Sequence, residues 1–222
     1  MAALADPHWE TVTEEMRLLL RYIGQQPFSQ RFYLAGGTAL ALRLGHRRSA
    51  DLDFFSETDE VHKETREEIQ RALGSVAPRV LEDVDGNLVL LAYGTRFGFF
   101  SYGYRLLEPL DAIEGVFVAS LVDIGLMMLD ALVGRGSRKD FYDLYLILQQ
   151  FNLPELLDLA RAKYPQARDF DLMVAESLVM FENAERDLPL ELLVHLPWLK
   201  VQEFFIAQAQ SLGRTWFAGY DP

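Results

Sequence analysis

The distribution of apolar residues along the chain changes near its middle. In the first half, several short segments have the alternation or the composition of β-strands, and Asp-Gly and Gly-Thr turns separate the last three of them. These segments are 31–35, 51–55, 79–84, 87–94 and 95–107. From Ser120 onward, apolar residues recur at three- and four-residue intervals, which predicts a succession of helices.

Three helices are predicted among these strands. Asp6-Pro7 is a favourable helix start, and the apolar spacing that follows carries this helix to about Gly24. Residues 36–45 predict a short helix that ends at Gly45, and residues 60–73 predict a charged amphipathic helix. The strands 79–107 are expected to pair as an antiparallel run.

In the second half, two helices are predicted to begin at the sequences SLVD and SRKD. In each, a serine precedes an aspartate by three residues, so the two side chains can cap the first backbone N–H groups of a helix. Further helices are expected from about Pro154, Phe170 and Pro197. The sequence therefore predicts an α+β fold: a mixed β-sheet flanked by helices over residues 1–118, with an N-terminal helix, and an α-helical domain over residues 119–222.

The longest apolar region, residues 115–134, is interrupted by Asp123 and Asp130. A charge at the centre of a bilayer costs roughly 3 kcal/mol or more, so this region predicts a buried helix and not a membrane span. The two aspartates are seven residues apart, and we expect them to share a solvated stripe on that helix.

The composition narrows the range of functions. Half of the 222 residues are apolar, which is enough for a sizeable core, and the formal net charge of -12 makes broad non-specific binding of DNA or RNA unfavourable. The chain contains no cysteine, and its N-terminus lacks the features of a secretory signal. We therefore expect a cytoplasmic protein without disulfides or thiolate metal sites.

Gly36 and Gly37 follow a predicted strand and open a predicted helix. Glycines let the backbone approach a ligand closely, and the N–H groups at a helix start attract anions such as phosphate. The hydroxyl of Thr38 could add a further contact. The alternative for the glycine pair is a plain tight turn.

Asp51 and Asp53 lie one residue apart on a predicted strand, so both carboxylates should face the same side of the sheet. Carboxylates repel each other unless a cation lies between them. A pair of Mg²⁺ ions roughly 4 Å apart, which bind the attacking and leaving oxygens of a phosphoryl transfer, would account for the arrangement. The alternative is a solvated strand face.

The order of strand, glycine turn, helix and acidic strand resembles the nucleotidyltransferase superfamily that includes DNA polymerase beta. More narrowly, Phe32 to Ser56 is similar to the AbiEii/AbiGii toxin nucleotidyltransferases, whose pattern is Gly-Gly-Thr followed by His-Arg-x-Ser-x-Asp-hydrophobic-Asp. The pattern falls on Gly36, Gly37, Thr38, His46, Arg47, Ser49, Asp51 and Asp53.

A second part of the resemblance lies in residues 134–148, where the family carries a basic-Asp-Phe-x-Asp-Leu segment on a helix. The segment matches Lys139, Asp140 and the residues that follow. Taken without the family, Asp140 can instead form a capping box with Ser137. Arg138 and Lys139 near a helix N-terminus oppose the usual charge preference there, which favours a phosphate partner.

The resemblance implies transfer of a nucleoside monophosphate from a nucleoside triphosphate to a hydroxyl group on RNA, a protein or a small molecule. It implies that Asp51 and Asp53 hold Mg²⁺ and are catalytic. The nucleotide-binding residues that it implies are Gly36, Gly37, Thr38, Arg47, Ser49, Lys139 and Asp140. It also implies a toxin-antitoxin effector with an antitoxin protein as its partner.

The chain departs from the family pattern at two places. The superfamily supplies a third metal-binding carboxylate from a later strand, and the nearest position here is Gly98, with no acidic residue between Asn87 and Leu107. The family lysine before the second motif corresponds to Met128. Two alternatives follow: a catalytically silent relative that binds a nucleotide or a protein partner, and a small-molecule transferase of the antibiotic-adenylylating kind.

Overall fold

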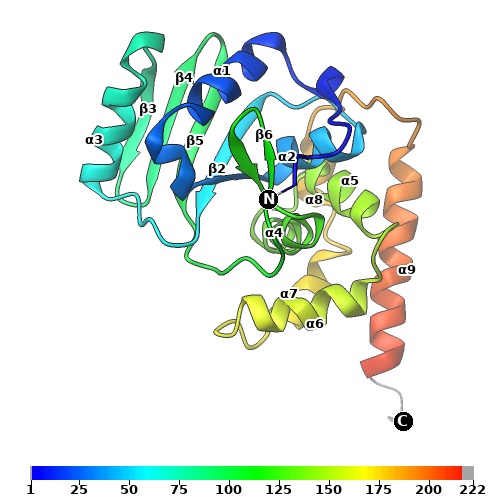
Figure 1. The fold of residues 1–222 in the computed structure, drawn as a ribbon. Coiled ribbons are helices and arrows are strands. Elements are labelled where there is room, and N and C mark those ends of the chain that lie inside the picture. The colour runs from blue at the N-terminus through cyan, green and yellow to red at the C-terminus, as the bar shows by residue number, and fades with distance from the viewer. Residues whose placement is uncertain (1, 217–222) are drawn as a thin grey trace. The chain divides into compact units, whose positions relative to one another are not determined.

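The structure is a computed structural model that describes residues 2–216 (Figure 1). It consists of two compact units, Met1–Ile124 and Gly125–Pro222. The division falls within helix α4 (Leu121–Gly134), whereas the sequence predicts a boundary after residue 118. Among the described residues, no helix has both the length and the apolar character needed to cross a bilayer.

A seven-stranded mixed sheet forms the centre of the first unit. Its strand order is β3-β4-β5-β2-β1-β7-β6, with β2 parallel to β5 and β1 parallel to β7, while the other neighbours are antiparallel. The strands are β1 (Tyr33–Ala35), β2 (Asp51–Ser56), β3 (Arg79–Val84), β4 (Asn87–Ala92), β5 (Thr95–Ser101), β6 (Asp111–Ile113) and β7 (Val116–Val118). The predicted α+β fold and the antiparallel run β3-β4-β5 are confirmed.

The structure corrects the prediction that residues 115–134 are one buried helix. Val116–Val118 is strand β7, which pairs in parallel with β1, and only the later part of the region is helical. Strands β6 and β7 are three residues each, too short for an alternating pattern to stand out. The turn between them is Glu114-Gly115, and both residues have positive φ, as a two-residue hairpin turn requires.

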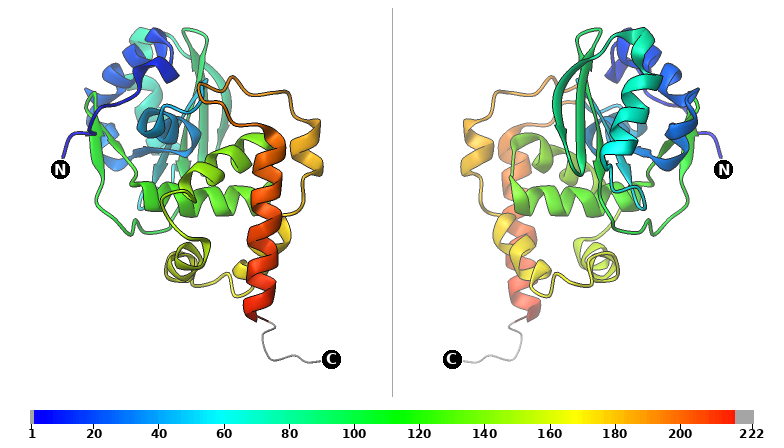
Figure 2. Two further views of the ribbon diagram at one scale, coloured as in Figure 1. Left: turned by 90° about the vertical axis from the view of Figure 1, so that its right-hand side faces the viewer. Right: turned by 90° about the vertical axis from the view of Figure 1, so that its left-hand side faces the viewer.

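One face of the sheet carries the core of the first unit. The ring of Phe99 lies at its centre, with ring centroids of Phe54, Phe32 and Phe28 at 5.1, 5.2 and 5.5 Å. Helices α1 (Glu14–Gly24) and α3 (Lys63–Ala72) lie on the same face of the sheet as each other, as Figures 1 and 2 show. Burial of each large aromatic ring contributes about 1.5–3 kcal/mol, so this cluster strongly fixes the strands that carry it.

The N-terminal helix begins later than its sequence predicts. The prediction of a helix from Asp6 is wrong, because Asp6 has a φ of 41° and a short 3₁₀ turn, Trp9–Thr11, precedes an extended Val12. Helix α1 starts at Glu14, where the Thr13 side chain accepts a hydrogen bond from the Met16 amide at 3.2 Å. A threonine cap close to the first apolar turn therefore takes precedence over the Asp-Pro start.

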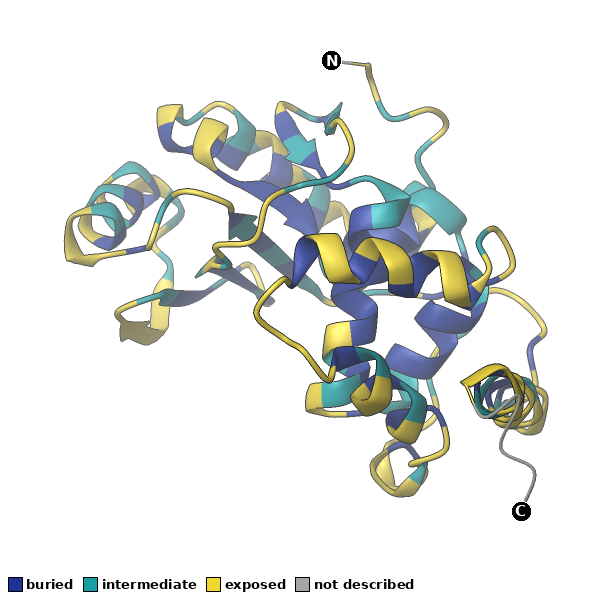
Figure 3. Ribbon diagram, turned by 90° about the horizontal axis from the view of Figure 1, so that it is seen from below, coloured by how far each residue is buried: buried dark blue, intermediate teal, exposed yellow. Residues whose placement is uncertain are grey.

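The other helices are α2 (Gly36–Leu44) in the first unit, and α5 (Arg138–Ile147), α6 (Leu153–Lys163), α7 (Phe170–Ser177), α8 (Glu182–Arg186) and α9 (Trp198–Trp216) in the second. In the second unit the ring of Phe141 lies 5.0, 5.2 and 5.7 Å from those of Phe181, Phe205 and Trp198. Single helices contain both buried and exposed residues (Figure 3), as their amphipathic sequences predict.

Asp123 does not lie on a solvated stripe as predicted. It is fully buried, and its carboxylate accepts hydrogen bonds from the amides of Leu107 and Glu108 and from the hydroxyl of Ser120. The Asp123 amide donates in turn to the Ser120 hydroxyl at 2.9 Å, so the predicted serine-aspartate cap is present. Two loop amides from outside the helix explain the burial of this charge, and sequence spacing does not reveal them.

The turn at Glu114 is held by ion pairs to helix α1. Its carboxylate accepts from Arg21 at 3.0 Å and from Arg17 at 2.9 Å, and these bonds lower the pKa of Glu114 to about 2 from its ordinary 4.5. The lowered pKa means that the carboxylate stabilises the fold above about pH 4.5 and loses this effect as the pH falls through 2.

We expect Glu114→Gln to lower the free energy of unfolding by about 1 kcal/mol at pH 7, because both arginines are partly exposed and solvent screens the pairs. Urea denaturation of both proteins at pH 7 and pH 3 measures this effect. The difference between the two proteins should shrink at the lower pH. A difference that stays constant or grows would contradict the role given to the ionised carboxylate.

Candidate functional site

Asp51 and Asp53 lie on β2, in the middle of the sheet. Along this strand Leu52, Phe54 and Ser56 are buried, and the alternate positions are only half-buried. The two aspartate side chains therefore lie on the face opposite the aromatic core, with 40% and 33% of their side-chain surfaces exposed. A solvent-borne ligand can reach both carboxylates.

The start of helix α2 lies beside Asp53. Strands β1 and β2 are antiparallel neighbours with Ala35 opposite Asp53, and α2 begins at the next residue, Gly36. A Cβ atom built on Gly36 would lie 3.8 Å from Oδ2 of Asp53, and Gly36 has a positive φ of 66°. Because Ala35 at the N-cap has no side-chain acceptor, the first amides of α2 have no side-chain cap there. The structure thus brings Gly36 and Asp53 together.

Thr38 and Ser49 bond to each other within the motif. The Thr38 hydroxyl donates to the backbone carbonyl of Asp51, and the Thr38 and Ser49 hydroxyl oxygens are 2.7 Å apart. Since the Thr38 proton is used in the first bond, Ser49 donates in the second. The two side chains tie helix α2 to the segment that enters β2, and so position the carboxylates.

The other motif residues also have local partners. Arg47 is buried, and its guanidinium donates to the backbone carbonyl of Arg48 at 3.1 Å. In the second unit, Lys139 is half-buried on helix α5. Asp140 is fully buried, accepts two hydrogen bonds from Arg135 at 2.7 and 2.9 Å, and forms the capping box with Ser137.

Sequence reasoning missed one charged residue of this site, Arg96. It lies on β5 directly opposite Asp51, and its Nη1 atom is 3.8 Å from Oδ2 of Asp51 and 3.6 Å from Oδ1 of Asp53. Alternation along β5 places Arg96 on the same face as Gly98, and this alternation is visible in the sequence. The parallel register that sets this face beside Asp51 and Asp53 could not be read from the sequence.

Gly98 lies directly opposite Asp53, at the position where the resemblance predicts a third carboxylate. A Cβ atom at Gly98 would lie 2.3 Å from Cζ of Phe100, so the Phe100 ring covers this position. The centroid of that ring is 5.4 Å from the centroid of Phe55. Residues 2–216 contain no group of three histidine, aspartate or glutamate side chains placed to hold a metal ion.

Asp83 and Asp85, the acidic residues that shortly precede Asn87 in the sequence, have another partner. Asp83 and Asp85 bind Arg66 at 2.5 and 2.6 Å, and Asp83 lies on β3 at the outer edge of the sheet. Asp51 and Asp53 can therefore give a divalent ion a share of its oxygen ligands, while phosphate oxygens and water supply the rest. The donors present fit one such ion, shared with a phosphorylated ligand.

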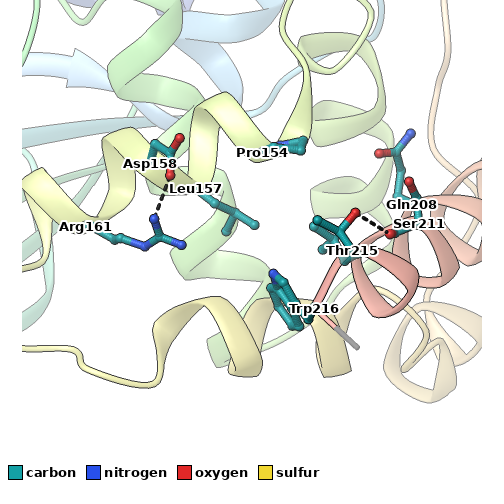
Figure 4. Close-up of a pocket in the computed structure, with 9 residues that line it drawn as sticks. Pro154, Leu157, Asp158, Arg161, Gln208, Ser211, Thr215 and Trp216 are labelled. Atoms are coloured by element: carbon teal, nitrogen blue, oxygen red, sulfur yellow. Dashed lines mark hydrogen bonds and ion pairs between the residues drawn. The ribbon is translucent and has the colours of Figure 1, made fainter. Parts of the chain in front are cut away.

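A separate hollow of about 210 Å³ lies in the second unit between helices α6 and α9 (Figure 4). Its acidic residue, Asp158, is paired with Arg161 at 2.6 Å, and Arg161 also binds Asp171. Trp216, Thr215 and Pro154 lie around the same hollow. Because its one carboxylate is already paired, this hollow offers less for phosphate chemistry than the face of the sheet that carries Asp51 and Asp53.

Comparisons with known proteins show which family the chain resembles. The family model described as "Nucleotidyl transferase AbiEii toxin, Type IV TA system" matches residues 17–195. An uncharacterised protein of Aquifex aeolicus, aq_aa25, is 36% identical over 197 residues, which are 86% of this chain and 93% of that protein.

Two solved structures are similar in fold. The antibiotic-resistance factor ANT(2'')-Ia has a TM-score of 0.52 at 15% identity, over 72% of this chain and 97% of that one. JHP933 of Helicobacter pylori has a TM-score of 0.49 at 17% identity, over 93% and 97% of the two chains. The likeness to ANT(2'')-Ia, at such low identity, is evidence of the fold alone.

The contact between Gly98 and Phe100 can be tested by a double-mutant cycle. We expect Gly98→Ala to lower the free energy of unfolding by about 1–2 kcal/mol, because the new methyl group displaces the Phe100 ring. In a Phe100→Leu background the added cost should fall below about 0.5 kcal/mol. Urea denaturation measures both, and Gly74→Ala, where a Cβ meets open space, is the matched control. Equal costs in the two backgrounds would show that the ring does not cover Gly98.

Proposed function

Because the chain belongs to the AbiEii nucleotidyltransferase family, we propose that it transfers a nucleoside monophosphate from a nucleoside triphosphate to a hydroxyl group of an acceptor. The observation that carries the proposal is the proximity of Gly36, at the start of α2, to the Asp53 carboxylate. Phosphate needs N–H donors and a divalent ion needs carboxylate oxygens. Here the start of α2, directly after β1, would supply the N–H donors, and the neighbouring strand β2 would supply the carboxylates.

In the proposed site, Asp51 and Asp53 would hold Mg²⁺. The ion supplies positive charge to the phosphates when it is bound. The backbone amides of Gly36 and Gly37 point toward the outer phosphates, where the dipole of α2 also favours negative charge. These groups orient the α-phosphate toward the acceptor.

The transfer is a substitution at phosphorus. The acceptor oxygen forms a bond to the α-phosphorus, the bond from that phosphorus to the pyrophosphate oxygen breaks, and the hydroxyl proton leaves to solvent. The chain contributes mainly position and charge, as is usual for phosphoryl transfer. Thr38 and Ser49 contribute indirectly, by fixing helix α2 against β2. For Arg47, Lys139 and Asp140 we keep the proposed role of nucleotide binding.

The acceptor and the biological role belong to the proposal as well. The description of the matching family names a toxin of a type IV toxin-antitoxin system. We therefore favour a role as a toxin effector with an antitoxin protein as its partner. The acceptor hydroxyl would then be on RNA or a protein. A small-molecule acceptor is the alternative suggested by the fold of ANT(2'')-Ia, whose name describes an antibiotic-resistance factor.

A second candidate function rests on Gly98 and Arg96. A glycine takes the position of a third carboxylate, and a guanidinium lies next to the two that remain. Two carboxylates bind a divalent ion weakly, because they leave most of its ligands to water and substrate. On this reading the chain binds a nucleotide or a protein partner at the same place and does not catalyse transfer.

Transfer can be measured directly with labelled nucleoside triphosphates, Mg²⁺ and cell extract. We expect the wild-type chain to label an acceptor, and Asp51→Asn/Asp53→Asn to reduce labelling at least about 100-fold, because both metal ligands lose their charge. Asp169→Asn is the matched control, since Asp169 is exposed and has no role in the proposed site. It should leave labelling unchanged.

The nature of the labelled product decides among the acceptors. Labelled RNA or protein supports the toxin-type activity, and labelled aminoglycoside supports the small-molecule alternative. If no acceptor is labelled by the wild-type chain, while calorimetry still detects nucleotide binding, the silent relative replaces the leading proposal. Equal labelling by the wild type and the double variant would remove Asp51 and Asp53 from the mechanism.

A further inference from the structure

Arg96 lies where a cation of the proposed reaction would act. Its guanidinium is within 4 Å of both carboxylates, and the parallel register of β5 and β2 holds its backbone directly opposite Asp51. The side chain is 42% exposed, so it can move. An arginine in this position changes the charge that the site offers to a triphosphate.

The small number of carboxylate oxygens at this site argues against binding of two divalent ions. In a two-ion site, the ions lie roughly 3.5–4 Å apart and contact both the attacking and the leaving oxygens. Each needs several oxygen ligands, and a carboxylate on the neighbouring strand would have to come from the position of Gly98. Gly98 has no side chain, and the Phe100 ring lies where its Cβ would be. Within residues 2–216, no third acidic or histidine side chain is therefore grouped with Asp51 and Asp53 to hold a second ion.

The charges support the same conclusion. Three carboxylates with two divalent ions carry one net positive charge. Two carboxylates with one divalent ion and one guanidinium carry the same net charge. With Gly98 at the third position and Arg96 beside the two carboxylates, a site that holds one ion therefore has the same net charge as that two-ion site.

We propose that Arg96 takes the place of a second divalent ion, so that the site binds the nucleotide triphosphate with one metal ion and one guanidinium. This inference rests on the proposed nucleotidyltransferase function. Arg96 lies within 4 Å of both carboxylates and would bind a phosphate oxygen of the nucleotide when the ion occupies Asp51 and Asp53. It is a substrate-binding residue of the reaction.

The distances favour this exchange of partners. Charge-assisted bonds between a guanidinium and a carboxylate are about 2.7–2.9 Å long, whereas Arg96 lies 3.6 and 3.8 Å from the two oxygens. Arg96 is thus attracted to the carboxylates without being fixed to either of them. A guanidinium has five N–H donors in one plane, so it can face a carboxylate and a phosphate together.

Counting bound ions tests the inference. Mn²⁺ binding is measured by electron paramagnetic resonance, with the ion alone and with non-hydrolysable α,β-methylene analogues of ATP, GTP, CTP and UTP. We expect one Mn²⁺ per chain when the favoured analogue is bound at saturation. Two Mn²⁺ ions per chain would overturn the inference.

The variant Arg96→Gln should move two affinities in opposite directions. Mn²⁺ alone should bind about threefold more tightly, because the carboxylates no longer have a competing cation. The Mn²⁺-analogue complex should bind about 10- to 100-fold more weakly, because a charged donor to phosphate is lost. Arg96→Lys, which keeps the charge but loses the planar donors, should lie between the two.

Arg79→Gln is the matched control, because Arg79 is an exposed arginine of the same sheet on the outer strand β3. It should change neither affinity. A purely structural role of Arg96 would alter both affinities in the same direction or neither, and either result would overturn the inference. Circular dichroism of the variants confirms that they are folded.

The inference and the proposed function fail in different experiments. Two bound ions, or unchanged analogue affinity in Arg96→Gln, overturn the one-ion site even if the wild-type chain transfers label. The wild-type chain could also transfer no label, yet bind one Mn²⁺ with the analogue, while Arg96→Gln binds the analogue more weakly. That result would contradict the proposed catalysis and support the one-ion nucleotide site. A wild-type chain that binds none of the four analogues would overturn both.

Discussion

The candidate site depends on the register of one strand, β2, between its two neighbours. The antiparallel register with β1 sets Ala35 opposite Asp53, and therefore sets the start of α2 beside the carboxylate. The parallel register with β5 sets Arg96 opposite Asp51. A slip by one residue would move both carboxylates to the core face, and burial of Phe54 against Phe99 opposes it. The hydrophobic core thus determines where the charged groups lie.

Much of this arrangement can be predicted from the sequence. Alternation along 51–55 gives both the strand and the face of Asp51 and Asp53, and Gly45, with a φ of 64°, ends the helix as expected. What remains hidden is non-local. The pairing of β2 with β5 joins residues more than forty positions apart, so Arg96 acquires its place only in the folded sheet. For the same reason, the loop amides that bind Asp123 could not be anticipated.

Matching a motif residue does not show that its side chain touches the ligand. A hydroxyl has one proton to donate, and Thr38 uses it on the carbonyl of Asp51 while Ser49 uses its own on Thr38. Neither can donate to a phosphate oxygen without breaking a bond that holds α2 to β2. Within the Gly-Gly-Thr turn, the donors left for phosphate are backbone amides at the start of the helix, where Gly36 brings the main chain close to Asp53. The motif then specifies a position of the backbone as much as a set of side chains.

The aromatic residues on the open face limit how the site can be built. Phe100 lies over Gly98 and packs on Phe55, which follows Asp53 by two residues on the same face. A side chain at Gly98 would have to displace that ring, so a carboxylate gained there would cost packing energy. Positive charge for a triphosphate must then come from another source in a chain that carries a net charge of -12. Arg96, held by the same pair of strands, is a cation that the fold places within 4 Å of both carboxylates.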